Sequence, residues 1–270
     1  MVQYFKYYRP GLGQSWLLAA LMFLGSIVVG FCLPRAPQSL TYFLSMLLPL
    51  AWCWWMGQQA YVAGSKACPV NDPHFGKIGA GRFMVLALLA LLSLTVVADP
   101  TTSFIPMPDT IRAMFERVFM DSPLWDMVLS TCILAPLLEE FLCRGMMLRG
   151  MLSHMSPRKA IIWSAVIFAV MHMNPWQSIP ALLIGLLLGW VYWRTHCLWA
   201  TIFLHCFNNS LSTLLSRLMP DIPVDASLQD LLPPTTWWIV FCVSVVVLTI
   251  TLYILHEKTL SPEIQAGPEA

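Results

Sequence analysis

The chain has 270 residues, of which 58% are hydrophobic and only 11% are charged. Because ordinary soluble domains carry about 25% charged residues, much of so apolar a chain must face lipid. Its 15 Lys and Arg against 14 Asp and Glu give a net charge of +1, which argues against a nucleic-acid-binding protein, since such binding depends on a basic surface. The eight cysteines form no CxxC pair and predict neither a disulfide framework nor a zinc ribbon.

Eight apolar runs fit or approach the roughly 20 residues that a membrane-spanning helix needs. The first follows a basic, aromatic N-terminal segment without a signal-peptidase site, so we expect an uncleaved signal anchor. The fifth and sixth are short and flank Asn174, which leaves open a tight hairpin or one broken segment. The sequence thus predicts an all-α fold, a polytopic transmembrane helical bundle of about eight spanning helices. The eight runs are Ser15–Leu33, Leu40–Val62, Phe83–Ala98, Leu124–Gly150, Lys159–Met173, Ile179–Trp193, Trp199–Leu218 and Trp237–His256.

The placement of Lys and Arg predicts the orientation of this bundle. Cytoplasmic loops carry an excess of positive residues. With the N-terminus inside, ten Lys and Arg fall in inner segments and four in outer loops, while Arg144 lies within a span. We therefore expect a multi-pass integral membrane protein with both termini in the cytoplasm, which agrees with an even number of spans.

Two loops and the C-terminal tail complete the organisation. Asp109–Asp121 alternates apolar and charged residues at helical spacing and predicts an amphipathic helix at the outer interface. Pro220–Thr236 is acidic and rich in proline, which is typical of an outer loop, and Ser261–Ala270 is expected to be disordered. No internal repeat of the transporter kind stands out. The chain divides into N-terminal helices with the interfacial helix (1–123), a helical core (124–218), and a last loop, helix and tail (219–270).

The fourth run carries three ionisable residues, Glu139, Glu140 and Arg144. A charge at the centre of a spanning helix costs about 2.5 to 3.5 kcal/mol, so such residues indicate function. Glu140 and Arg144 are four residues apart on one helix face and can pair, whereas Glu139 points about 100° away and is left to face a cavity. The alternative is that all three form one buried polar knot that holds helices together.

Polar residues also interrupt the fifth and seventh runs. His172 lies near the end of the fifth run. In the seventh, His205 and Asn209 are four residues apart on one face, with Asn208 as the alternative partner. At about 1.5 Å of rise per residue, Glu139, His172, His205 and Asn209 fall at overlapping depths. They are therefore expected to converge.

Three motifs in this order resemble the CPBP intramembrane endopeptidases. The motifs are Glu139-Glu140-x-x-x-Arg144, Phe168-x-x-x-His172 and His205-x-x-x-Asn209. The family includes type II CAAX prenyl endopeptidases and bacterial Abi proteins linked to bacteriocin processing and self-immunity. The resemblance covers about Leu124 to Leu218, and the first three helices match only in being hydrophobic.

This resemblance implies a function and a role for each residue. Glu139 and His172 would activate a water molecule, His205 and Asn209 would stabilise the oxyanion, and Glu140, Arg144 and Phe168 would support them. No cofactor is expected, because an asparagine is a poor zinc ligand and no H-E-x-x-H motif is present; the alternative is a zinc site formed by Glu139, His172 and His205. The implied substrate is a peptide or protein associated with membrane lipid, lipidated or bacteriocin-like.

Two other functions fit parts of the pattern. A transporter would use the carboxylates and histidines as a proton relay, although the lack of repeats counts against it. A non-catalytic membrane scaffold or immunity protein would bind a partner without cleaving it. Substrate identity, metal dependence and oligomeric state do not follow from the sequence.

Overall fold

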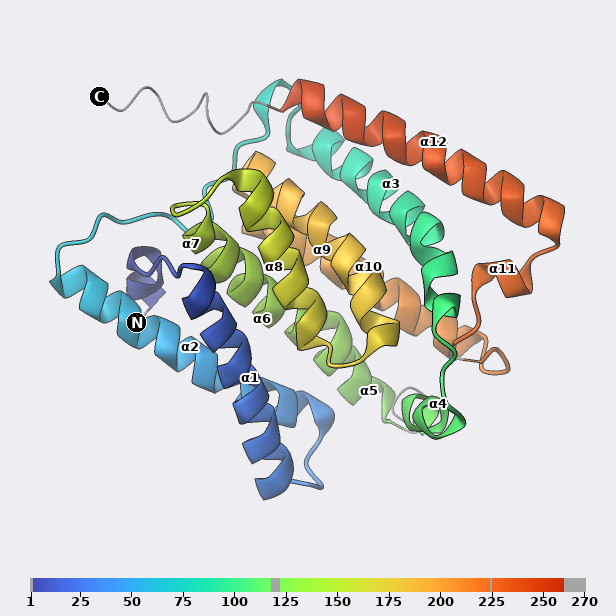
Figure 1. Cartoon of the computed structure of the whole chain (residues 1–270), viewed down its shortest axis with the longest axis horizontal. Coiled ribbons are helices and arrows are strands. Elements are labelled where there is room, and N and C mark those ends of the chain that lie inside the picture. The colour runs from blue at the N-terminus through green and yellow to red at the C-terminus, as the bar shows by residue number, and fades with distance from the viewer. Residues whose placement is uncertain (1, 118–121, 224, 260–270) are drawn as a thin grey trace.

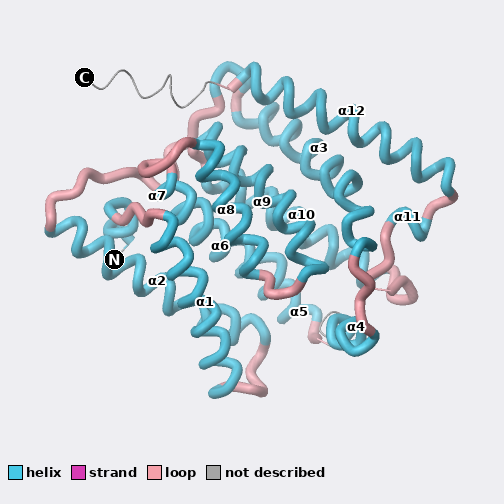
Figure 2. Tube along the Cα trace, viewed as in Figure 1, coloured by secondary structure: helices cyan, strands magenta, loops and turns pink. Residues whose placement is uncertain are grey.

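The computed structural model describes residues 2–117, 122–223 and 225–259. Within these ranges all regular secondary structure is helical and no strand occurs (Figure 2). The predicted all-α class is therefore confirmed for the described part of the chain. The tail Ser261–Ala270, for which disorder is expected, lies outside these ranges.

The described residues form eight long helical segments, one for each predicted apolar run. The fourth is composite, and runs without a break through α5 (Leu124–Met127), η5 (Val128–Leu134), α6 (Ala135–Glu140), η6 (Phe141–Leu148) and α7 (Arg149–Met151). The stretches η5 and η6 on either side of α6 are π-helical, a geometry that is frequent at functional sites. The other seven are α1 (Leu12–Cys32), α2 (Gln38–Val62), α3 (Ala80–Ala98), α8 (Pro157–Met171), α9 (Pro175–Thr195), α10 (Leu198–Leu218) and α12 (Pro234–Lys258).

Five helices in the described ranges are long and apolar enough to cross a membrane, so the predicted count of about eight spans is not confirmed. Those five are Leu12–Cys32, Gln38–Val62, Ala80–Thr101, Pro175–Thr195 and Pro234–Lys258. With 15 residues, α8 is shorter than the roughly 20 that a span needs. The composite segment and α10 carry the ionisable and amide side chains of the motifs, which lower their hydropathy.

Short elements precede or connect the long helices: η1 (Val2–Tyr7), η2 (Gly76–Ile78), η3 (Asp99–Phe104), α4 (Asp109–Glu116) and α11 (Leu228–Leu231). The helix α4 occupies the first part of the predicted interfacial helix, whose residues 118–121 lie outside the described ranges. On α4, Arg112 forms an ion pair with Asp225 at 2.8 Å. This contact ties α4 to the predicted outer loop, which contains the single turn of α11.

The composite segment lies at the centre of the bundle (Figure 1). It packs against α2 on one side and against α8, α9 and α10 on the other. The pair α1 and α2 flanks this core, while the pair α3 and α12 packs on the opposite flank against α9. Side chains that point inward from α6 are therefore surrounded by four other helices.

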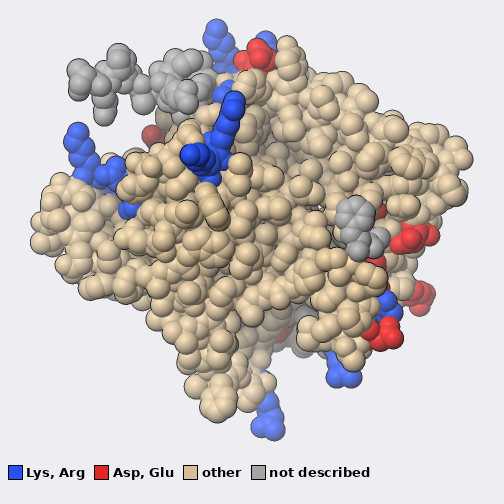
Figure 3. Space-filling model, viewed as in Figure 1, with Lys and Arg blue, Asp and Glu red and all other residues tan. Residues whose placement is uncertain are grey.

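Both described ends of the chain lie at one end of the bundle. The Arg149 guanidinium donates to the carbonyls of Phe5 and Tyr8 at 2.8 and 2.7 Å, and Arg194 donates to the Thr259 hydroxyl at 2.8 Å. Lys and Arg side chains gather around this end, at the upper left of Figure 3, whereas most visible acidic side chains lie at the lower right. The arrangement matches a positive-inside topology; which end faces the cytoplasm stays a prediction.

A tight hairpin joins α8 and α9, which settles the choice between a hairpin and one broken segment. Met173 turns the chain with a positive φ of 57°, and the Asn174 side chain caps α9 by accepting a hydrogen bond from the Gln177 amide at 2.9 Å. A Cβ on Gly185 would lie 3.2 Å from Ala165. The missing side chain lets α9 approach α8 closely and brings the Gly185 carbonyl next to the central helix.

Candidate active site

The centre of the site is an ion pair between Glu140 on α6 and Arg144 on η6. Oε1 of Glu140 and Nη1 of Arg144 are 2.7 Å apart, and both side chains are fully buried. Arg144 also donates to the Gly185 carbonyl at 3.1 Å and lies over the Phe168 ring, 4.5 Å from its centroid. A buried charge needs this degree of pairing and hydrogen bonding. Phe168 and Arg144 thus form the support of the site.

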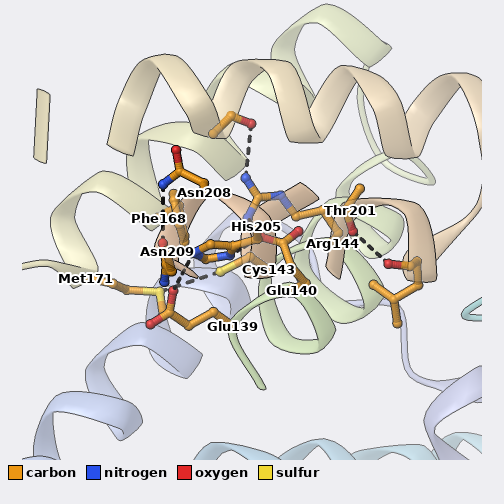
Figure 4. A network of polar contacts seen from close by, with 12 residues as sticks. Glu139, Glu140, Cys143, Arg144, Phe168, Met171, Thr201, His205, Asn208 and Asn209 are labelled. Carbon is orange, nitrogen blue, oxygen red and sulfur yellow. Dashed lines mark hydrogen bonds and ion pairs between the residues drawn. The ribbon is translucent and has the colours of Figure 1, made fainter. Parts of the chain in front are cut away.

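His205 on α10 is oriented by the same carboxylate (Figure 4). Its Nδ1 lies 2.9 Å from Oε1 of Glu140, and its ring meets the Phe168 ring edge to face at 5.6 Å. A carboxylate paired with arginine can only accept a hydrogen bond, so Nδ1 carries the proton. The other ring nitrogen, Nε2, then faces Glu139, whose Oε2 is 3.9 Å away.

Glu139 points away from Glu140, as adjacent residues on a helix must. Its side chain is 15% exposed, whereas that of Glu140 is fully buried. The Tyr42 hydroxyl on α2 donates to Oε1 of Glu139 at 2.7 Å. Sequence reasoning missed Tyr42, which belongs to none of the motifs. The sequence gives only a general indication of its role, because a tyrosine inside an apolar helix needs a hydrogen-bond partner for its hydroxyl.

His172 directly follows the last residue of α8, and its ring is fixed by its own helix. Nδ1 lies 2.9 Å from the Phe168 carbonyl, and the two rings meet edge to face at 5.0 Å. Because a carbonyl only accepts, Nδ1 is the donor, and in the neutral ring Nε2 is left as an acceptor. The spacing Phe168-x-x-x-His172 therefore sets the tautomer that a proton-accepting histidine requires.

The amide of Asn209 has a different partner from the one that the spacing predicts. Its Nδ2 donates to the Thr131 carbonyl on η5 at 3.0 Å, and its Oδ1 accepts from Asn208 at 3.3 Å. Pairing with His205 is therefore not how this amide is held. The physical reason is that η5 packs along α10 and places the Thr131 carbonyl within reach of Asn209, while His205 turns toward Glu140. The second amide hydrogen of Asn209 is left for another acceptor.

A cavity of about 500 Å³ brings the four predicted catalytic residues together. Glu139, His172, His205 and Asn209 all line it, on α6, at the end of α8 and on α10. Other polar residues share its wall, including Gln38, Thr95, Ser130, Thr131, Gln177, Asn208 and Ser212. A volume of this size lies within the range of ordinary ligand sites and has room for a short stretch of peptide together with water.

A second, smaller cavity of about 180 Å³ adjoins the same residues. Tyr42, Glu139 and His172 line both cavities. The small cavity extends from them toward α1 and α2, where Met22 and Met46 contribute to its wall. Glu139 thus lies where the larger cavity meets the smaller one.

The alternative zinc set is only partly assembled. Glu139 and His205 approach each other to 3.9 Å, while the Phe168 carbonyl engages Nδ1 of His172 and leaves Nε2 as its potential ligand atom. Among the residues described, no group of three His, Cys, Asp or Glu side chains has a geometry that could hold a metal ion. Metal dependence therefore stays a prediction.

Fold and site together define a class: an integral membrane protein whose helices surround a polar cavity with a carboxylate, two imidazoles and an amide. Residues 121–211 match the family model described as type II CAAX prenyl endopeptidase Rce1-like. The resemblance to the CPBP family of proteases is thereby confirmed for this segment, which contains Glu139, Glu140, Arg144, Phe168, His172, His205 and Asn209. Tyr42 lies outside it. Neither a curated protein nor a solved structure is similar enough to the chain to count as a match.

Proposed function

We propose that this chain is an intramembrane endopeptidase that hydrolyses a peptide bond of a membrane-associated substrate. The observation that carries the proposal is the shared cavity lined by Glu139, His172, His205 and Asn209. The match of the surrounding segment to a protease family supports it. The family description names a CAAX prenyl endopeptidase, so a lipidated peptide cleaved near the cytoplasmic face is the substrate class that we favour over a bacteriocin-like one.

In the proposed reaction Glu139 and His172 activate a water molecule. Glu139 takes a proton from the water, and Nε2 of His172 accepts the other hydrogen bond. The oxygen attacks the scissile carbonyl, and the proton passes to the leaving amine as the C–N bond breaks. A general base of this kind contributes about 10² to 10⁴ in rate.

His205 and Asn209 stabilise the oxyanion in this proposal. Asn209 has one amide hydrogen beyond the one it donates to Thr131. Because Nδ1 of His205 already faces Glu140, Nε2 donates only when both ring nitrogens are protonated. The contact with Glu140 thus fixes the ring so that Nε2 faces the cavity side of Glu139.

We propose that the reaction needs no metal. The support is the use of Asn209 at the third motif, since an amide is a poor zinc ligand. Activity that survives a strong chelator is the expected result. Stoichiometric zinc in the purified protein, lost in His172→Ala, would instead establish the alternative set of Glu139, His172 and His205.

The central test compares peptides released from membranes that contain wild-type protein, Glu139→Gln or Glu257→Gln. Glu139→Gln keeps the side-chain size but removes the base, whereas Glu257 is an exposed glutamate on α12. We expect at least one peptide to be released from membranes that contain wild-type protein or Glu257→Gln. The same peptide should be missing from membranes that contain Glu139→Gln. Identical peptide sets in all three membranes would contradict the proposal.

The same variants separate the two rival functions. A proton-coupled transporter would give pH-dependent flux in proteoliposomes without cleavage. A non-catalytic scaffold or immunity protein would keep its phenotype in Glu139→Gln.

A further inference from the structure

We propose that residues 105–116 form a strap that covers the mouth of the larger cavity and has to open before a peptide can enter. This inference rests on the proposed function and adds the control of access to it. The strap consists of α4 and the residues directly before it, and α4 lies away from the N-terminus, at the lower right of Figure 1. Whichever face of the membrane this end meets, the peptide passes the strap there.

The strap lines the cavity at the end away from the most buried catalytic groups. At the catalytic end, the side chains of His205 and Glu139 are only 5% and 15% exposed. At the other end, Met107 and Phe115 of the strap line the wall, together with Asp225 from the loop before α11. Because no residue of α4 is buried, the strap lies between the cavity and the surface of the bundle.

A bidentate ion pair, which we call the latch, holds the strap in place. Nε and Nη2 of Arg112 donate to the two carboxylate oxygens of Asp225, at 2.9 and 2.8 Å. Arginine pairs most firmly with a carboxylate in this two-bond geometry. The two residues are 113 positions apart in the chain, so the latch joins two separate connections across the mouth of the cavity.

The latch is firm enough to close the strap but accessible enough to release it. The side chains of Arg112 and Asp225 are 34% and 22% exposed, so water and salt compete with the pair. A second fastening lies at the other end of the strap, where the Trp176 indole donates to the Ile105 carbonyl at 2.9 Å. Since α4 buries no residue, it lacks the apolar packing that makes a segment resist local opening.

The open strap has a suitable environment beside the bundle. Phe115 lines the cavity, whereas its neighbour Met114 is 52% exposed on α4. An amphipathic helix of this kind is stable in the membrane interface, where Phe115 stays out of water after it leaves the cavity. The main cost of opening is therefore the latch itself.

Thiol accessibility tests the strap without depending on cleavage. Ser130 lines the cavity and is 2% exposed, so Ser130→Cys places a reporter of nearly the same shape behind the strap. A charged methanethiosulfonate reagent should reach this thiol only when the strap opens. Mass spectrometry distinguishes its modification from that of the native cysteines. Each variant below carries this reporter in the full-length protein, and the reporter alone serves as the reference.

Three variants separate the latch from other effects of charge. Asp225→Asn removes one charge of the latch, and the exchange of Arg112→Asp together with Asp225→Arg restores the pair with reversed signs. Asp109→Asn is the matched control, because it removes the other carboxylate that pairs with Arg112, at a side chain that is 95% exposed. All three should unfold at the temperature of the reference.

We expect Asp225→Asn to speed modification of the reporter about fivefold, the upper range for an accessible ion pair. The exchange should return the rate most of the way to the reference, and Asp109→Asn should leave it unchanged. Raising the salt from about 50 mM to about 500 mM should also speed modification in the reference, because salt screens accessible charges. The same change should have little effect in Asp225→Asn.

Equal modification rates in the reference and in Asp225→Asn would overturn the strap, and so would a reference rate that does not change with salt. Fast modification in the exchange variant would mean that these substitutions loosen the bundle in general, and would overturn it too. Should Asp225→Asn fail to fold, the salt dependence of the reference decides. If the rates follow the latch but the wild type releases no peptide, the proposed function fails while the strap stands.

Discussion

The Tyr42 hydroxyl lies 2.7 Å from Oε1 of Glu139, although 97 residues separate the two in the chain. Glu139 belongs to the segment that matches the protease family, whereas Tyr42 is on α2, outside it. The hydrogen bond therefore joins the N-terminal helices to the proposed catalytic base. It fixes one oxygen of the carboxylate and leaves Oε2 directed toward His205.

Tyr42→Phe should lower kcat by about tenfold with little change in KM. Hydrogen bonds to charged groups contribute about 1.5 to 3 kcal/mol, and about 1.4 kcal/mol in the barrier corresponds to a factor of ten in rate. The measurement is steady-state cleavage of a lipid-anchored peptide. Tyr253→Phe, at a position 65% exposed on α12, is the control. A Tyr42→Phe protein with the wild-type rate would exclude a role for this hydroxyl.

Arg144→Leu should destabilise the fold as well as abolish activity. It leaves the Glu140 carboxylate buried without its cation, and breaking a buried ion pair in this way costs about 3 to 5 kcal/mol. Thermal unfolding of the protein in detergent measures the change. Arg144→Lys should recover only part of the loss, because a point charge cannot serve Glu140, the Gly185 carbonyl and the Phe168 ring together.

The exposed Arg158 provides the control for this prediction. Arg158→Leu should leave the unfolding temperature unchanged. Equal stability of Arg144→Leu and Arg158→Leu would mean that the ion pair contributes nothing to the fold.

Asn209→Ala should reduce kcat by about 10² to 10³, the typical effect of losing one oxyanion donor. Asn208→Ala should have a smaller effect, because Asn208 touches Oδ1 of Asn209 and acts only by orienting that amide. Both variants should unfold at similar temperatures. A larger loss of rate in Asn208→Ala than in Asn209→Ala would mean that Asn208 is the oxyanion donor and that Asn209 orients it.

Asp126→Ala should destabilise α2. The Asp126 carboxylate, on α5, accepts hydrogen bonds from the amides of Gln38 and Ser39 at 2.7 and 2.9 Å, and from the Ser39 hydroxyl. It caps the first turn of the helix that carries Tyr42. Loss of such a cap costs about 0.5 to 2 kcal/mol, and we expect activity to fall with it as Tyr42 moves.

Asp109→Ala is the matched control for this cap. The Asp109 side chain is 95% exposed where it pairs with Arg112, and surface pairs of this kind contribute about 0 to 1 kcal/mol. Its unfolding temperature should remain close to that of the wild type. The capping role would be refuted by an Asp126→Ala protein that is as stable as this control.

The sequence by itself determined the helices and the local geometry of the motifs. Hydropathy located all eight long segments, because the length of an apolar run is a local property. The spacing of Glu140 and Arg144 predicted a contact that is present, and the spacing of Phe168 and His172 placed a carbonyl next to a ring nitrogen. Each of these follows from the helical repeat within a few residues of chain.

Only the tertiary structure decided which groups meet across helices. Tyr42 reaches Glu139, His205 bonds Glu140 instead of Asn209, and the composite segment contains two π-helical stretches. The smaller cavity exists because α1 and α2 pack against the end of α8. A helical repeat fixes which residues share a face but not which face of another helix they meet, since that depends on how all the side chains of the bundle pack.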